Sequence, residues 1–206
     1  INGIKRKEKF KTQVPKWTSN KIDKDVFIKM ETPKSSVRIA FSKEYAFNQK
    51  NRILTSYLAD ILTLRYTESL REKEGGTYGA HVNASVDKLP ISKANLQVNF
   101  DCDADKVEHL LPIVYQEIDK IKKGEIAAED IEKTRTNYLK SREDSKNFNS
   151  YSMNLIYNYF ENNYDMNDPA TYVDIVKSIT AKDIQEFANS FLNKADSYEI
   201  VFKPLK

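Results

Sequence analysis

Histidine and cysteine are scarce in this chain of 206 residues, which has two histidines, His81 and His109, and one cysteine, Cys102. A disulfide within the chain needs a pair of cysteines, and a structural zinc site draws its four ligands from Cys and His. The sequence therefore cannot build either feature by itself. It also lacks the His-x-x-x-His and Cys-x-x-Cys spacings that are typical of metal sites.

Glycine is also rare, with five residues in all, and neither a Walker loop nor a dinucleotide-binding fingerprint can be drawn from them. No run of about 18 apolar residues is present, so we expect no membrane-spanning helix. The chain is 40% hydrophobic and 31% charged, with a mean hydropathy of −0.65. This balance is too apolar for a disordered chain and predicts a soluble globular protein.

Positive charge is concentrated at the beginning of the chain. Residues 1–24 hold eight Lys or Arg residues against Glu8 and Asp23, and they begin with Ile1 and lack the apolar stretch of a signal peptide. We interpret the chain as a fragment or a processed product in which residues 1–24 form a basic linker or lead-in segment and residues 25–206 form one domain. The segment lacks the interleaved arginine and aromatic residues of a nucleic-acid surface, so we expect no nucleic-acid partner.

Hydrophobic patterns predict alternating blocks of strands and helices. A wide apolar face at helical spacing runs from Asn48 to the pair Gly75-Gly76, and two runs of alternating residues follow it. The predicted strands are 25–31, 36–42, 78–87, 94–102 and 197–203. The predicted helices are 48–74, 103–123, 127–144, 149–162, one that begins at Asp168-Pro169, and 180–192. This order predicts an α+β fold, with a mainly antiparallel mixed sheet and helices packed on one face.

The two alternating runs predict a hairpin with one apolar and one polar face. Tyr78 and Cys102 share the apolar parity, whereas His81 and Asn83 lie on the polar face. Cys102 is expected to be a small buried hydrophobic residue rather than a nucleophile. His81 and His109 are expected to be separate surface residues. An aromatic group at helical spacing favours core packing over base stacking: Tyr151, Tyr157, Tyr159, Phe160 and Tyr164.

One segment suggests chemistry, namely Leu70-Arg71-Glu72-Lys73-Glu74-Gly75-Gly76-Thr77-Tyr78-Gly79. A long helix ends here, two glycines reverse the chain, and a strand begins, so Arg71 and Tyr78 could converge at the corner. The alternative is that Arg71 pairs with Glu68 or Glu74 and that Tyr78 only fills the sheet. The residues alone leave both interpretations open.

This arginine-to-tyrosine segment, after a long core helix and before a hairpin, resembles the C-terminal region of the insulinase/pitrilysin family of zinc metallopeptidases, the inverzincins. The resemblance extends through Phe100-x-Cys102 and Lys123-Gly124-Glu125-Ile126 to Ala127-x-Glu129-Asp130-Ile131. It implies one of several homologous α+β domains that enclose a chamber, either on one chain or as paired subunits. In that family the zinc is bound by His-x-x-Glu-His in the N-terminal half, and this chain has no such motif.

The resemblance implies that this chain binds no zinc itself and completes the site of an N-terminal half, which holds the metal. Arg71 and Tyr78 would bind the substrate carbonyl and stabilise the oxyanion, while His81 and Asn83 would line the peptide-binding wall. The expected partners are that half, or a homologous subunit, and a peptide substrate. Bacterial members of the family favour a periplasmic location.

Two alternatives remain beside this hypothesis. The chain could be a non-catalytic scaffold or partner subunit of the same fold, as in assemblies related to processing peptidases. It could also bind nucleic acid through its Lys-rich segment, which predicts salt-sensitive binding that is lost when residues 1–24 are removed. We rank the nucleic-acid hypothesis last.

Overall fold

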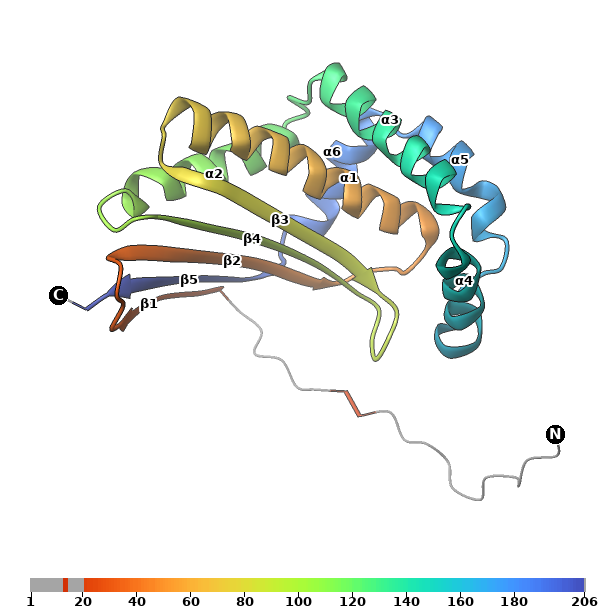
Figure 1. Cartoon of the computed structure of the whole chain (residues 1–206), viewed down its shortest axis with the longest axis horizontal. Helices are drawn as coiled ribbons and strands as arrows, with labels where there is room; N and C mark the ends of the chain where they lie inside the picture. The colour runs from red at the N-terminus through yellow and green to blue at the C-terminus, as the bar shows by residue number, and fades with distance from the viewer. Residues whose placement is uncertain (1–12, 15–20, 206) are drawn as a thin grey trace.

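A computed structural model describes residues 13–14 and 21–205 of the chain. The expected α+β layout is present, with the helices gathered on one side of a single curved sheet (Figure 1). In chain order the elements are β1 (Lys21–Ile28), β2 (Lys34–Glu44), α1 (Gln49–Tyr66), the π-helical segment η1 (Thr67–Lys73), β3 (Thr77–Asp87), β4 (Lys93–Asp103), α2 (Val107–Lys122), α3 (Ala128–Ser145), α4 (Asn149–Asn162), α5 (Asp168–Ser178), α6 (Ala181–Leu192) and β5 (Asp196–Pro204).

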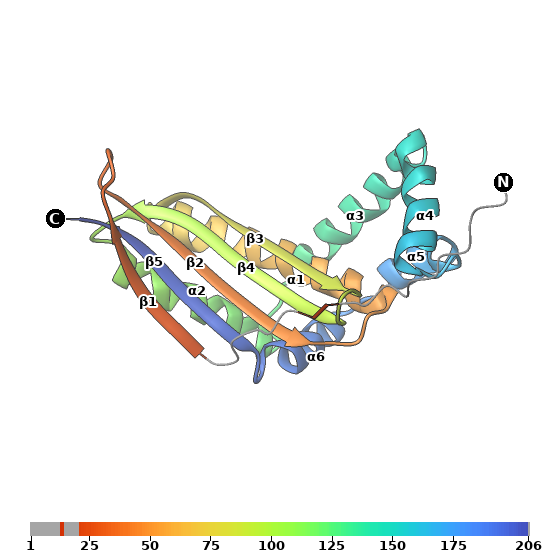
Figure 2. The same cartoon turned by 90° about the horizontal axis from the view of Figure 1, so that it is seen from below.

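The five strands lie in the order β1-β5-β2-β4-β3. β1 runs parallel to β5 and every other neighbouring pair is antiparallel, which confirms a mixed, mainly antiparallel sheet. Seen from below, the sheet lies in front of the helices (Figure 2). We call the strand face that points away from the helices the open face. β3 and β1 are the edge strands of the described sheet, so β3 is the edge nearest the predicted site.

β1 begins earlier than the sequence pattern indicated. The predicted strand was 25–31, whereas β1 covers Lys21–Ile28 and pairs along its whole length with β5. The parallel partner provides hydrogen bonds that a local pattern cannot show. Most of the predicted basic segment 1–24 lies outside the described residues, so its role as a linker stays a prediction.

The core lies between the sheet and the long helix α1. Asn48 caps this helix as predicted, because its side chain accepts a hydrogen bond from the backbone N–H of Asn51. A stripe of α1 side chains is completely buried: Tyr57, Leu58, Ile61, Leu62 and Tyr66. They pack against the inner side of the central strands. Helix α6 contributes to the same core, and it begins with the capping box predicted at Thr180. Burial of this stripe fixes the direction of α1, and therefore the place where it ends.

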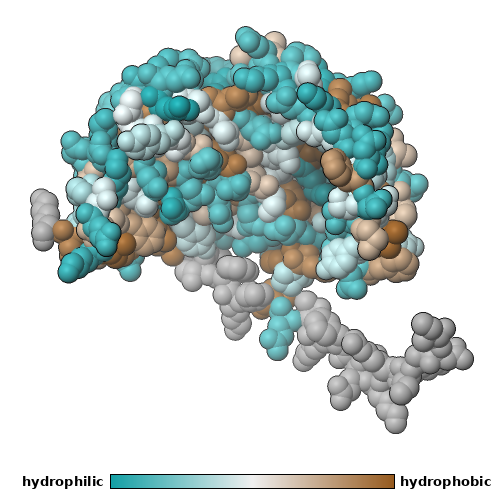
Figure 3. Space-filling view, viewed as in Figure 1, coloured by the Kyte–Doolittle hydropathy of each residue, from teal (hydrophilic) through white to brown (hydrophobic). Residues whose placement is uncertain are grey.

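Helix α4 contradicts the expectation that its aromatic residues form core. No residue of α4 is buried, and Tyr157, Tyr159 and Phe160 are all exposed. Met153, Ile156, Tyr157 and Phe160 follow helical spacing and form one exposed stripe, with 64%, 49%, 61% and 73% of each residue accessible. The space-filling view shows hydrophobic atoms at the end of the molecule where α4 lies (Figure 3). The spacing correctly indicated an apolar helix face, but this face has no covering element among the described residues.

Within residues 21–205, no helix is both long enough and apolar enough to cross a membrane.

Candidate functional site

The residues of the predicted site follow a change in helix geometry at the end of α1. The hydroxyls of Thr63, Thr67 and Ser69 each donate a hydrogen bond to the carbonyl four residues earlier, at 2.9, 2.8 and 2.8 Å. Such bonds compete with the backbone ladder and accompany bends in helices. The backbone widens into the π-helical segment η1, a geometry that is frequent at functional sites. Leu70 stays buried within this segment, while the next residue, Arg71, points outward and is exposed.

Two glycines end the helix, as the sequence predicts. Gly75 has a φ of +53°, and its N–H donates to the Arg71 carbonyl at 3.1 Å. The N–H of Gly76 donates to the Leu70 carbonyl at 2.9 Å. A Cβ atom on Gly76 would lie 2.6 Å from a methyl carbon of Leu110, a completely buried residue at the start of α2. A left-handed backbone and a close approach therefore require glycine at these two positions.

Polar contacts hold this corner against the beginning of α2. The Lys106 ammonium donates to the Gly75 carbonyl at 3.1 Å, and His109 Nε2 lies 2.7 Å from the Glu74 carboxylate. His109 is thus a surface residue, as expected, but it has a structural partner. The turn between Arg71 and Tyr78 is fixed by side chains from a different helix.

Arg71 does not pair with either of the carboxylates that the sequence offered. Glu68 is taken by Lys73 at 2.7 Å, and this hydrogen bond lowers the pKa of Glu68, while Glu74 is taken by His109. Among the described residues, the Arg71 guanidinium has no hydrogen-bond or ion-pair partner. The interpretation of Arg71 as a member of a local ion pair is therefore wrong. Its donors are free to bind something else.

Tyr78 faces away from the core because of a β-bulge. Thr77 pairs with Cys102 and Ala80 pairs with Phe100, so β3 has one more residue than β4 between these pairs. The Thr77 hydroxyl donates to the Asp101 carbonyl at 2.7 Å and anchors the bulge. Tyr78 leaves the inward parity and is 86% exposed. The alternative in which Tyr78 fills the sheet is wrong.

Lys34, at the start of β2, is a neighbour of Tyr78 that the sequence did not reveal. Its ammonium lies 5.1 Å from the centre of the Tyr78 ring and 3.1 Å from the Asp103 carboxylate, and the hydrogen bond to Asp103 raises the pKa of Lys34. Lys34 and Asp103 are register partners on the open face of the sheet. Gly79 within the strand was a signal for the bulge, because glycine inside a strand often marks one. No local signal connects Lys34 with Tyr78, since they are far apart along the chain.

The other two predicted site residues follow Tyr78 along β3. His81 and Asn83 are both exposed and pair across the sheet with Asn99 and Gln97. They lie on the open face, as predicted, and the structure does not bring His81 near the contact between His109 and Glu74. Cys102 is buried, as predicted, and burial raises the pKa of its thiol to about 11. It therefore remains a neutral thiol at physiological pH.

No metal centre is offered by the described residues. Within residues 21–205, no three or more His, Cys, Asp or Glu side chains are grouped so that they could hold a metal ion. The residues present thus do not fit a zinc ion. The corner instead presents hydrogen-bond donors of two kinds, the cationic Arg71 and the neutral Tyr78 hydroxyl.

Residues 1–138 match the family model described as the peptidase M16 inactive domain. The chain belongs to this family. The insulinase-like resemblance of the arginine-to-tyrosine segment is therefore confirmed, as an M16 inactive domain without the zinc motif. No curated protein matches the chain.

Solved structures share the fold of this M16 inactive domain at low sequence identity. A protease from Helicobacter pylori is 15% identical with a TM-score of 0.79, over 97% of this chain and 48% of that one. The peptidase M16 inactive domain from Pseudomonas fluorescens is 15% identical with a TM-score of 0.76, over 95% and 47%. The periplasmic protease PqqL from Escherichia coli is 16% identical with a TM-score of 0.78, over 91% and 21%. The M16 inactive domain thus spans half or less of each of these chains.

Proposed function

We propose that this M16 inactive domain completes the active site of a zinc metallopeptidase whose metal is held by an N-terminal half. In this proposal Arg71 and Tyr78 donate hydrogen bonds to the carbonyl oxygens of a bound peptide and to the oxyanion that develops during hydrolysis. The zinc of the other half would polarise the scissile carbonyl. The M16 inactive domain would have no peptidase activity alone.

The observation that carries this proposal is that two hydrogen-bond donors, the Arg71 guanidinium and the Tyr78 hydroxyl, lie at one corner and have no hydrogen-bond partner among the described residues. A solvent-exposed arginine without a carboxylate partner and an outward tyrosine come from adjacent elements, η1 and β3. Oxyanion stabilisation depends on donors that are already oriented before the reaction begins. The glycine turn, the bulge and the contacts from α2 supply that orientation. An arginine is always charged, so its contribution would not depend on pH in the physiological range.

Substrate binding would use the strand that carries Tyr78. β3 pairs only with β4 in the described sheet, so its outer edge carries backbone donors and acceptors for an extended peptide. Such strand addition gives affinity through main-chain hydrogen bonds. His81 and Asn83, exposed on β3, would contact the side chains of the same peptide. We infer that a peptide binds in extended form along the outer edge of β3, where side chains on the open face can contact it.

The partner of the M16 inactive domain would be the remainder of a longer protein, or a homologous subunit. This is supported by the solved proteases, in which the matched region is half of the chain or less. The exposed stripe on α4 suits such a contact, because a contiguous apolar helix face of this kind marks an interaction surface more often than a free one. Since PqqL is described as a periplasmic protease, we also propose a periplasmic location for this protein.

The test is peptide cleavage by the full-length protein, with single substitutions in the M16 inactive domain. Arg71→Ala and Tyr78→Phe should each lower kcat/KM by about 10²- to 10³-fold, the cost of removing one oriented donor in other enzymes. Lys133→Ala on α3 and Tyr159→Phe on α4 are controls for the loss of a cation and of a tyrosine hydroxyl, because both residues are exposed and neither belongs to segment 70–79 or to the exposed stripe of α4. We expect these controls to be within twofold of the wild type.

Full activity of both corner variants would refute the roles assigned to Arg71 and Tyr78. If the wild-type full-length protein and its co-purified partners cleave no peptide at all, the chain is instead a scaffold subunit. That outcome would overturn the enzymatic proposal and favour the non-catalytic alternative.

A further inference from the structure

A cavity lies on the helical side of the sheet, far from the Arg71 corner. Its volume is about 510 Å³, and its lining comes from the beginning of α1, from α3, α4 and α5, and from the end of β3. Arg52 in this lining and Arg71 are separated by roughly 28 Å at the usual helical rise of about 1.5 Å per residue. The space-filling view shows the surface hollowed between the end of β3 and the helices beyond it (Figure 3). The cavity shares no residue with the corner proposed to bind substrate.

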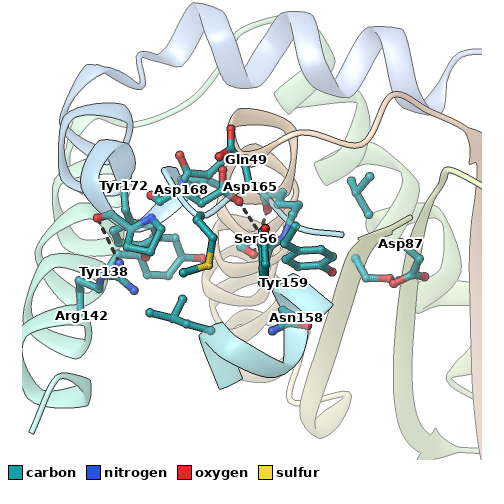
Figure 4. A pocket seen from close by; sticks show the side chains of 18 of the residues that line it. Gln49, Ser56, Asp87, Tyr138, Arg142, Asn158, Tyr159, Asp165, Asp168 and Tyr172 are labelled. Atoms are coloured by element: carbon teal, nitrogen blue, oxygen red, sulfur yellow. Dashed lines mark hydrogen bonds and ion pairs between the residues drawn. The ribbon is translucent and has the colours of Figure 1, made fainter. Parts of the chain in front are cut away.

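Arg142, on α3, is a cation whose orientation is fixed by aromatic rings. Its guanidinium lies between the rings of Tyr151 and Tyr172, with its central carbon 4.6 and 4.7 Å from their centres. The two rings belong to α4 and α5, so three helices meet at this side chain. In Figure 4, Arg142 lies with Tyr172 at one end of the cavity, whereas Asp87 lies at the other. Stacking on both faces fixes the plane of the guanidinium and leaves its edge for hydrogen bonds.

The edge of the Arg142 guanidinium has hydrogen-bonding capacity that the chain does not use. One Nη atom donates to the Pro169 carbonyl at 3.3 Å, which is long for such a bond, and the buried Nε atom has no partner. Within the part of the chain that the structure describes, no carboxylate forms an ion pair with Arg142. A guanidinium has five N–H donors and stays charged in proteins. Arg142 is therefore an oriented cation without a counter-charge.

The carboxylates around the cavity are already matched or lie in water. Asp168 is 3.7 Å from Arg52, and although burial raises the pKa of Asp168, the cations Arg52 and Lys88 oppose this effect. The Asp87 carboxylate accepts hydrogen bonds from two side chains on the open face of the sheet, at 3.1 and 3.0 Å. Asp165 is exposed, so water weakens the field of its charge. The charge that remains to be matched in the cavity is the positive charge of Arg142.

Much of the remaining lining is apolar or aromatic, and includes Ile53, Val86, Tyr138, Leu155 and Met166. Sites for small molecules typically have volumes of about 300–1,000 Å³ and combine an apolar lining with a few polar groups that fix the ligand. A ligand that fits this arrangement has one negative group and an apolar or aromatic body. A carboxylate suits the negative group, because its two oxygens match the planar fork of a guanidinium.

We propose that this cavity is a binding site for organic carboxylates that have an apolar or aromatic body. The carboxylate accepts hydrogen bonds from the Nη atoms of Arg142, and the body packs on Leu155 and Met166. Two sources share this chemistry, the C-terminal residue of a peptide and a free arylalkanoic acid. The inference does not depend on the proposed roles of Arg71 and Tyr78, because the two sites share no residue.

The test is calorimetry of the 206-residue chain with N-acetylphenylalanine, 3-phenylpropionate, the amide of each acid, and acetate. We expect a Kd of about 1 mM or tighter for at least one of the two aromatic acids. Its amide should bind at least about tenfold more weakly, because a charge-assisted hydrogen bond is lost. Acetate, which has no apolar body, should bind more weakly still. Binding of N-acetylphenylalanine alone would assign the site to peptide C-termini, and binding of 3-phenylpropionate would assign it to free acids as well.

A matched pair of variants tests the role of Arg142. Arg142→Gln should weaken binding of the acid by at least about tenfold and leave the affinity for the amide unchanged. Lys140→Gln is the control, because Lys140 is an exposed cation on the same helix that does not line the cavity. It makes the same change in net charge, and we expect it to leave the affinity for the acid unchanged.

The comparison of acid and amide uses the unmodified chain, so it stands even if Arg142→Gln does not fold. Equal affinities for an acid and its amide, or no binding of either aromatic acid at about 10 mM, would overturn the proposal. Equal loss of binding in Lys140→Gln and Arg142→Gln would also overturn it, because the net charge of the chain would then explain both. Activity of the full-length protein does not enter this test, so its outcome is separate from that of the proposed function.

Discussion

Gly76 gives the sharpest test of how the corner is built, because the structure shows which atoms a larger residue would meet. In Gly76→Ala the new methyl group would lie 2.6 and 2.7 Å from the two methyl carbons of Leu110. Leu110 is completely buried, so its side chain can move away only towards other core side chains. Overpacking of this kind costs about 1–3 kcal/mol. For a chain of this size, a loss of about 2 kcal/mol lowers Tm by roughly 4–8 °C.

The control is Gly79→Ala, three residues further along the chain. No atom lies within 4 Å of the position that a Cβ would take at Gly79, and its φ is not positive. We therefore expect Gly79→Ala to change the free energy of unfolding by about 0.5 kcal/mol or less. Urea denaturation of both variants measures this difference directly.

A double substitution separates the clash from any general effect at the turn. Leu110→Ala alone leaves a cavity and should cost about 2–5 kcal/mol. If the methyl groups of Leu110 cause the strain, Gly76→Ala should cost little in the Leu110→Ala background, with a coupling energy of about 1 kcal/mol or more. Additive effects, or equal destabilisation by Gly76→Ala and Gly79→Ala, would refute the close approach as the reason for glycine.

Two further predictions concern buried groups. Glu117 is buried and lies 3.2 Å from Arg65 and 2.7 Å from Lys120. Glu117→Ala removes both contacts and leaves Arg65 with Asp130 at 3.9 Å and the Glu125 carbonyl at 2.6 Å, so it should cost about 1–3 kcal/mol in urea denaturation, and a loss below about 0.5 kcal/mol would contradict this. The pKa of Cys102 rises on folding from 9.0 to about 11, so its contribution to stability is complete below pH 9 and is lost as pH rises through about 11. Cys102→Ala should therefore have a shallower decline in unfolding free energy over this range, and native wild type should react with a thiol reagent at pH 8 far more slowly than the unfolded chain.

Local signals in the sequence predicted the ends of the elements well. The Asn48 cap, the Thr180 capping box and the glycine with positive φ at residue 124 all depend on groups within a few residues of one another. The polar and apolar faces of β4 follow the period of two without interruption, which is why Cys102 is buried as expected. Features that depend on residues close together in the chain could therefore be predicted from the sequence alone.

The features that could not be predicted from the sequence depend on contacts between segments that are far apart along the chain. Glu68 and Glu74 were suitable partners for Arg71 by spacing, but Lys73 and His109 occupy them, and His109 comes from another helix. The spacing of α4 indicated an apolar face and could not say whether anything covers it. The prediction that Tyr78 lies on the apolar face was wrong. Strict alternation assumes a regular ladder, and the one additional residue of β3 at the bulge moves Tyr78 to the open face.

The bulge at Thr77 has a consequence for how related chains should be compared. Inserting one residue into β4 between Phe100 and Cys102 would restore a regular ladder and turn the phenol ring towards the helices, away from the open face. Such a chain would still carry an arginine seven positions before a tyrosine, and a search for that spacing would accept it. A reliable criterion for this corner is therefore that β3 has one more residue than β4 between the pairs Thr77–Cys102 and Ala80–Phe100, in addition to the two side chains themselves.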